Sequence, residues 1–176
     1  TKHRKGASHR KTVTPEIRKI LSDLALETKA NRAILFEYSN GTSNLVGLPF
    51  LYTSATCEVV TPGTASVAHL YQKTNTSLVA EFLEKLDETG YYLIDSIDDV
   101  RNTLPVLYNF MKPNATHSAL FYAIYGVYDT IGFLVITTTS DQRFCKKESI
   151  ARIAEAAQKI SAMLNFDKIY DDPKSR

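Results

Sequence analysis

Cysteine is scarce in this sequence and tryptophan is absent. The only cysteines are Cys57 and Cys145, so the chain has neither a disulfide framework nor the paired ligand spacing of a zinc site. No apolar run approaches the ~20 residues of a membrane-spanning helix, and no signal-peptide pattern begins the sequence. The sequence therefore predicts a globular protein of a reducing compartment, and we expect it to be cytoplasmic.

The motifs of common enzyme chemistry are also missing. There is no phosphate-binding P-loop, no Rossmann glycine fingerprint, no HExxH zinc motif and no G-x-S-x-G nucleophile elbow. The segment 61–64 has the small residues of a phosphate loop, but the Gly-Lys-Ser/Thr that should follow is lacking. We therefore predict no enzymatic activity, no catalytic residue, no metal site and no resident cofactor.

Positive charge is concentrated at the start of the chain, although the formal net charge is only +2. No acidic residue precedes Glu16, and residues 1–13 have almost nothing to bury, so they are predicted to form a disordered basic tail. Two functions stay open for this tail. It can bind nucleic-acid phosphates, or it can flank a membrane anchor of a longer protein, because the sequence starts at Thr1 and not at Met. The residues concerned are Lys2, Arg4, Lys5, Arg10 and Lys11.

Amphipathic helices are predicted near both ends. Thr14 as N-cap and Pro15 at the first helical position mark the start of a helix over 15–29. The second helix, over 147–165, has apolar residues at i, i+3, i+4 and i+7. Between them, runs rich in β-branched and aromatic residues predict strands. The strands are expected at 33–38, 48–60, 91–94, 118–127 and 131–139, with short helices near 65–72, 76–90 and 95–111.

Three segments carry a family resemblance. They read ANRAILFEY (30–38), IGFLVI (131–136) and RFCKKE (143–148). In their order and spacing they resemble the opening strand, the penultimate motif and the start of the last helix of a GAF domain. Cys145 departs from the pattern, because the family usually has a Ser or Thr N-cap there. The resemblance predicts a GAF-like domain over 14–167, followed by a frayed C-terminal segment, 168–176.

The resemblance implies an α+β fold in which a central antiparallel sheet carries the N- and C-terminal helices on one face. Short helices and loops then cover a cleft on the other face. Such a domain is expected to be a non-catalytic sensory or regulatory module that binds a small molecule in the cleft and dimerises through its terminal helices. The alternatives are a scaffold that binds no ligand and a nucleic-acid-associated protein that uses the basic tail.

Candidate ligand-binding residues come from two groups. Tyrosine combines an apolar ring with a polar tip, which suits a small-molecule cleft. Aspartates at the turn 95–100 can accept hydrogen bonds from a ligand, although they can equally cap a helix. Period-two alternation separates Leu120, Tyr122 and Ile124 from their neighbours but does not say which set faces the cleft. The predicted ligand-binding residues are Tyr52, Tyr92, Asp95, Asp98, Tyr108 and Tyr122.

Overall fold

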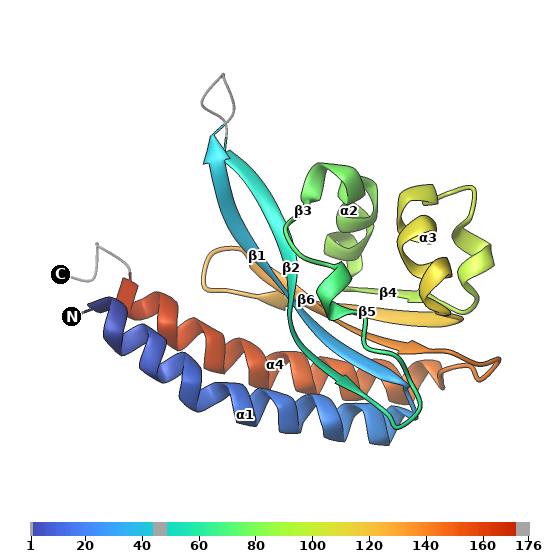
Figure 1. Cartoon of the computed structure of the whole chain (residues 1–176), viewed down its shortest axis with the longest axis horizontal. Coiled ribbons are helices and arrows are strands. Elements are labelled where there is room, and N and C mark those ends of the chain that lie inside the picture. Colours follow the sequence, from blue (N-terminus) through green and yellow to red (C-terminus); the bar gives the residue numbers. More distant parts are fainter. Residues whose placement is uncertain (1, 44–48, 172–176) are drawn as a thin grey trace.

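A curled antiparallel sheet organises the structure (Figure 1). The computed structural model describes residues 2–43 and 49–171 of the chain. The sheet has six strands in the order β3-β2-β1-β6-β5-β4, and every neighbouring pair is antiparallel. The strands are β1 (Arg32–Ser43), β2 (Pro49–Val60), β3 (Thr74–Asn75), β4 (Tyr91–Ile94), β5 (Ser118–Tyr125) and β6 (Thr130–Thr138).

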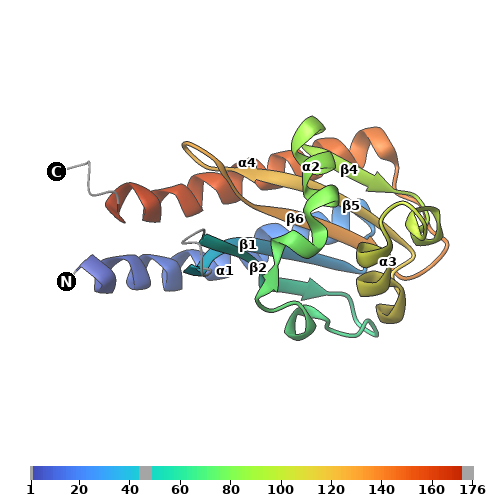
Figure 2. The ribbon, with the colours of Figure 1, turned by 90° about the horizontal axis from the view of Figure 1, so that it is seen from above.

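The two long helices lie on the same face of this sheet, which confirms the predicted fold class. They are α1 (Lys2–Thr28) and α4 (Lys146–Asp171). They run antiparallel and side by side, so the first turn of α1 and the last turn of α4 lie at the same end (Figures 1 and 2). The shorter helices lie on the opposite face.

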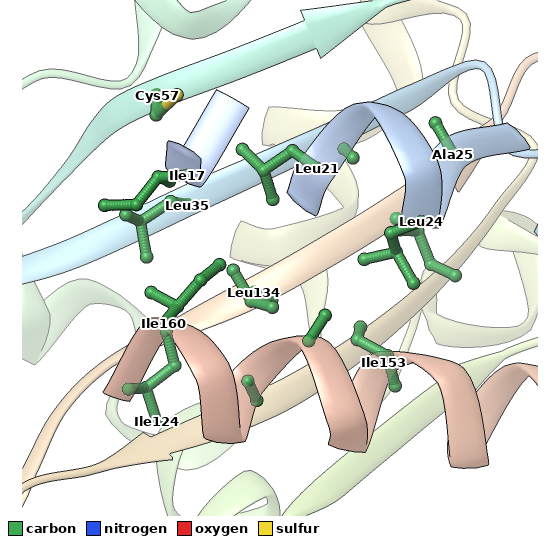
Figure 3. Close-up of a cluster of buried hydrophobic side chains, with 14 of the residues drawn as sticks. Ile17, Leu21, Leu24, Ala25, Leu35, Cys57, Ile124, Leu134, Ile153 and Ile160 are labelled. Atoms are coloured by element: carbon green, nitrogen blue, oxygen red, sulfur yellow. The ribbon is translucent and has the colours of Figure 1, made fainter. Parts of the chain in front are cut away.

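The helix-side core, formed between α1, α4 and the sheet, is almost entirely aliphatic. Leu21, Ile153 and Ile160 are fully buried against Leu35 of β1 and Leu134 of β6 (Figure 3). Each such side chain contributes roughly 1.5–3 kcal/mol by leaving water. This face therefore contributes substantially to stability. Among the described residues, no helix combines the length and apolar character needed to cross a bilayer.

Helix α1 begins at Lys2 and not at Thr14, so the segment predicted to be a disordered tail is helical. Thr14 does not cap the helix; its hydroxyl donates back to the carbonyl of Arg10 at 2.8 Å. Tertiary contacts explain why the helix extends N-terminal to Pro15. Val13 is buried in the helix-side core, and Arg10 forms an ion pair of 2.5 Å with Glu37 of β1. At the other end, α4 continues to Asp171, and residues 172–176 lie outside the described residues.

Short elements cover the other face of the sheet. The helix expected at 65–72 is only the 3-10 turn η1 (Ala68–Leu70). The helix expected at 76–90 is present as the 3-10 turn η2 (Thr76–Val79) and α2 (Ala80–Thr89), which ends at Gly90 in the left-handed conformation. The helical pieces that follow are η3 (Ile97–Val100), α3 (Pro105–Met111) and η4 (Lys112–Asn114).

Candidate functional site

A cavity lies between the sheet and these short elements, on the face opposite α1 and α4. Its volume is about 70 Å³. Alternate residues of the two central strands form its floor, because the register pairs Ile34 with Val135 and Phe36 with Phe133. Its roof comes from η2, α2 and α3. The roof residues are Val79, Phe82, Leu107, Phe110 and Met111.

Aromatic rings occupy much of the space around the cavity. Phe36 and Phe133 stack with their centroids 4.8 Å apart, and Phe82 meets Phe121 edge to face at 4.6 Å. Tyr71 packs against Phe36 at 5.8 Å. Aromatic pairs of this kind add about 0.5–1.5 kcal/mol each beyond the area that they bury. The cluster explains why the cavity is small, and a larger occupant would have to separate these rings.

Arg32, the first residue of β1, lines one end of the cavity and is only 3% exposed. Its Nε donates to the carbonyl of Ala65 at 2.9 Å, and its Nη1 donates to the carbonyl of Asn114 at 3.0 Å. Among the residues that the structure describes, no carboxylate lies within 4.0 Å of this guanidinium. Burial lowers the pKa of Arg32, although the charge of Glu58 opposes this effect. The cavity therefore has a buried cation at one end.

Two buried threonines that line the cavity have hydroxyls without a hydrogen-bond partner among the described residues. Thr137 of β6 is 3% exposed and Thr53 of β2 is 4% exposed. A buried hydroxyl without a partner costs about 1–3 kcal/mol. Thr137 is the direct register partner of Arg32, so its unpaired hydroxyl and the buried cation lie at the same end of the cavity. Thr53 pairs with Tyr38 and lies toward the other end.

Side-chain hydrogen bonds fix the loops at the Arg32 end. The Tyr71 hydroxyl donates to the Phe110 carbonyl at 2.8 Å, and the Asn114 amide donates to the Tyr71 oxygen at 2.7 Å. Burial raises the pKa of Tyr71, so its hydroxyl stays protonated near neutral pH. On β2, the carboxylate of Glu58 accepts from the backbone N–H groups of Val67 and Ala68 at 3.0 and 3.1 Å. These bonds hold the walls of the cavity in place.

A wider depression, of about 610 Å³, lies on the surface where α1 ends and α4 begins. Exposed side chains form its edge, among them Glu27, Lys29, Cys145 and Arg152. Unlike the cavity under α2 and α3, this depression has no buried polar group among its lining residues that lacks a partner. The cavity is therefore the better candidate site.

None of the six predicted ligand-binding residues is among those that line the cavity. Tyr122 lies on the other face of the sheet, packed against the helix-side core, because its neighbour Phe121 faces the cavity. Tyr92 and Tyr108 are partly buried and pack against the hydrophobic core on the cavity side of the sheet, which includes Phe36, Phe82 and Phe133. Tyr52 is half-buried on β2 beside β3. The binding roles of these residues stay predictions.

The two predicted aspartates are exposed. Asp98 accepts from Lys112 at 2.9 Å. This hydrogen bond is the main reason that the pKa of Asp98 is lowered, and the Tyr108 hydroxyl contributes as well. The structure thus brings Asp98 and Tyr108 together, but at the surface. Asp95 is exposed just after β4. Within the described residues, no cluster of three or more His, Cys, Asp or Glu side chains is arranged to bind a metal ion.

Arg32, Thr53 and Thr137 were not predicted as site residues, although Arg32 falls within the segment that carries the family resemblance. A signal was present for Arg32. A charged residue directly before an apolar strand is ordinarily expected at the surface. If the strand is a central one, the charged residue is buried and has to form hydrogen bonds with buried partners. The threonines gave no such signal, because threonine is common on ordinary strands.

At the sequence level, no known family profile matches the chain, and no curated protein sequence matches it either. Solved structures do resemble it. The GAF domain of PixJ from Thermosynechococcus elongatus, in its blue-light absorbing form, superimposes with a TM-score of 0.71 at 13% identity, covering 93% of this chain and 91% of that one. GAF3 from a Synechocystis protein, in its photoproduct state, gives 0.69 at 9% identity, covering 89% and 96%.

A third example is the chromophore-binding domain of a bacteriophytochrome from R. palustris. It superimposes with a TM-score of 0.68 at 12% identity, over 91% of this chain and 57% of that one. Identities this low establish the architecture and leave the ligand open. The three superpositions each cover 89–93% of this chain. The chain therefore has the fold of a GAF domain.

Proposed function

We propose that this chain is a non-catalytic sensory or regulatory domain that binds a small molecule in the cavity beneath α2 and α3. The observation that carries the proposal is the division of the two central strands between the two faces. Phe36 and Phe133 line the cavity, whereas the adjacent Leu35 and Leu134 pack in the helix-side core. A ligand that separates the two rings would move the same strands on which α1 and α4 rest.

The similar structures include domains that bind a chromophore, and the residues of this chain do not fit such a group. The cavity of about 70 Å³ is well below the roughly 300–1,000 Å³ of sites for larger organic ligands. A chromophore attached through a thiol would also need a cysteine at the cavity. Cys57 lies in the helix-side core and Cys145 is exposed next to α4. We therefore propose a ligand much smaller than a chromophore.

The test is a thermal-shift screen of the chain with nucleotides, cyclic nucleotides, amino acids and small organic acids. A ligand of the cavity should raise the melting temperature of the wild-type protein. It should fail to do so for Val79→Phe, which places a ring at the half-buried edge of the cavity. Leu78→Phe is the matched control, because Leu78 is 55% exposed and is not among the lining residues.

Backbone amide exchange then tests the coupling. Bound ligand should slow exchange in α4 as well as in the strands, because the two are packed together. A screen in which no compound raises the melting temperature would favour the scaffold alternative. A hit that Val79→Phe and Leu78→Phe bind equally well would place the ligand elsewhere and overturn the proposed site.

A homodimer through α1 and α4 is part of the proposal. Leu26 supports it, since this large apolar side chain on α1 is 72% exposed. Sedimentation should show a dimer for the wild-type chain and a shift toward monomer for Leu26→Glu. Sedimentation of the wild-type chain as a monomer at high concentration would remove dimerisation from the proposal and leave the cavity unaffected.

The membrane and nucleic-acid alternatives for the basic segment stay predictions. Arg10 is engaged within the domain, because its Nη1 and Nη2 both contact the Glu37 carboxylate, at 3.1 and 2.5 Å. For Lys2, Arg4, Lys5 and Lys11 the structure describes the helical backbone and not the side chains. Salt-dependent DNA binding that disappears when residues 2–9 are deleted would support the nucleic-acid alternative.

A further inference from the structure

The polar groups of the cavity are unevenly placed, and they restrict which ligand fits. At one end lie the Arg32 guanidinium and the Thr137 hydroxyl, which are cross-strand partners on the same face of the sheet. Both can donate hydrogen bonds, and the hydroxyl has no partner among the described residues. Next to them the floor becomes apolar, with Ile34, Val135 and then the Phe36–Phe133 pair.

From this arrangement we infer that the cavity binds a small monocarboxylate. Its carboxylate would lie against Arg32 and Thr137, and its short apolar chain would lie along Ile34 and Phe36. The inference rests on the proposed function, because it names the ligand class of the same cavity. A carboxylate accepts hydrogen bonds and donates none, which matches two neighbouring groups that can both donate.

Other ligand classes match these groups less well. An amine would place a second positive charge beside the buried guanidinium, which is unfavourable where water is excluded. A neutral alcohol or amide offers an acceptor but adds no negative charge beside the guanidinium. A phosphate would lose its strong hydration against Ile34 and Val135, which offer it no hydrogen bonds. A carboxylate with an apolar chain matches both the donor groups of Arg32 and Thr137 and the apolar floor next to them.

The size of the cavity bounds the chain length. A volume of about 70 Å³ is well below the roughly 300–1,000 Å³ of sites for larger organic ligands, so the cavity favours short-chain acids. Thr53 is too distant to take part, because its register partner Tyr38 is six residues along β1 from Arg32, or about 20 Å at 3.3 Å per residue.

The test is an NMR titration of the 176-residue chain with acetate, propionate and butyrate, and with butyramide, 1-butanol and n-butylamine as neutral and cationic probes of the same carbon number as butyrate. We expect the dissociation constant to fall by about fourfold for each methylene that the cavity can bury. We expect butyramide and 1-butanol to bind at least about tenfold more weakly than butyrate, because they lack the charge. We expect n-butylamine to produce no shifts at the cavity.

Three variants locate the carboxylate. Thr137→Val removes the unpaired hydroxyl at constant shape and should weaken butyrate binding about three- to tenfold. Thr53→Val is the same change at the far end and should leave the dissociation constant unchanged. Arg32→Lys keeps the charge but loses the planar fork, so it should also weaken binding. Because Arg32 also ties Ala65 and Asn114 together, the two threonine variants decide the question if Arg32→Lys does not fold.

The outcomes separate this inference from the proposed function. If butyramide and 1-butanol bind as tightly as butyrate, or if Thr137→Val and Thr53→Val have equal effects, the carboxylate assignment is wrong while a small-molecule cavity remains. If no acid binds but another compound of the broad screen does, the assignment is also wrong and the sensory proposal stands. If neither the acids nor the screen gives a cavity ligand, both fail.

Discussion

On strand β1, Ala33 and Leu35 lie in the helix-side core, whereas Arg32, Ile34 and Phe36 line the cavity. One stretch of five residues thus serves two environments. The helix side is almost entirely aliphatic. The cavity side has stacked rings, a buried cation and two hydroxyls without partners among the described residues.

This difference indicates a division between stability and function. Interiors are normally packed like organic crystals, and buried polar groups normally have partners. The cavity side departs from both, because it encloses unfilled space and two buried hydroxyls without partners among the described residues. Such departures cost stability, and they are expected at a site that binds a ligand. The following predictions compare matched positions on the two sides.

The largest difference is expected for matched isoleucine truncations. Ile136 is fully buried in the helix-side core, and Ile34 is equally buried but borders the cavity. We expect Ile136→Ala to lower the free energy of unfolding by about 2–5 kcal/mol. Ile34→Ala should cost nearer to 2 kcal/mol, because part of its surface already faces empty space. Urea unfolding at constant m-value measures both, and equal losses would contradict the contrast.

The two cysteines provide a second comparison, by chemical labelling. Cys57 is buried in the helix-side core, and burial raises the pKa of its thiol, so little reactive thiolate forms. Cys145 is exposed. Iodoacetamide should modify Cys145 faster than Cys57 by about two orders of magnitude or more, because Cys57 reacts only after the core opens. Peptide mass spectrometry over time gives both rates, and similar rates would show that α1 does not protect β2.

A smaller effect of opposite sign is expected at two adjacent threonines of β6. The Thr138 hydroxyl shares a hydrogen bond with Ser118 and donates toward the Gln142 carbonyl, whereas the Thr137 hydroxyl has no partner within residues 2–43 and 49–171. Thr138→Val should therefore lower the free energy of unfolding by about 1 kcal/mol, and Thr137→Val should leave it unchanged or raise it by a similar amount. Chemical denaturation distinguishes the two. A loss at Thr137 as large as at Thr138 would mean that its hydroxyl is satisfied by water.

Much of the architecture could be predicted from local patterns. The helix and strand periodicities placed both long helices and five of the six strands. Strand β3 was not expected, and β1 and α4 continue five and six residues past their expected ends. The largest difference is at the start of α1. There Thr14 and Pro15 give a strong helix-start signal. The continuation upstream depends on contacts that no local pattern reveals, such as the burial of Val13 and the ion pair of Arg10 with Glu37.

The cavity could be predicted only in part, for a geometric reason. Period-two alternation divides β5 into two sets of side chains, and only packing decides that Phe121 faces the cavity and Tyr122 the helices. The tyrosines that the sequence favoured lie around the cavity or, for Tyr122, on the other face of the sheet. The lining of the cavity depends instead on phenylalanine, Arg32 and threonines whose importance comes from lacking partners, and that property belongs to the folded structure.

Asp98 is a predicted ligand-binding residue for which the structure supplies another role, and here the expected effect is the smallest. Lys112 lowers the pKa of Asp98 below its ordinary 3.8, so the native state holds fewer protons at this group than the unfolded chain does. The stabilisation is therefore present above the unfolded-state pKa and is lost as the pH falls through the lower, folded-state pKa. Asp98→Asn should lower the melting temperature slightly at neutral pH, and the difference from wild type should disappear in acid.

Because Asp98 is exposed and not among the cavity-lining residues, butyrate should bind the variant and the wild type equally well. A clear loss of butyrate affinity in Asp98→Asn would instead extend the ligand site to the surface beside Tyr108, as the sequence predicts.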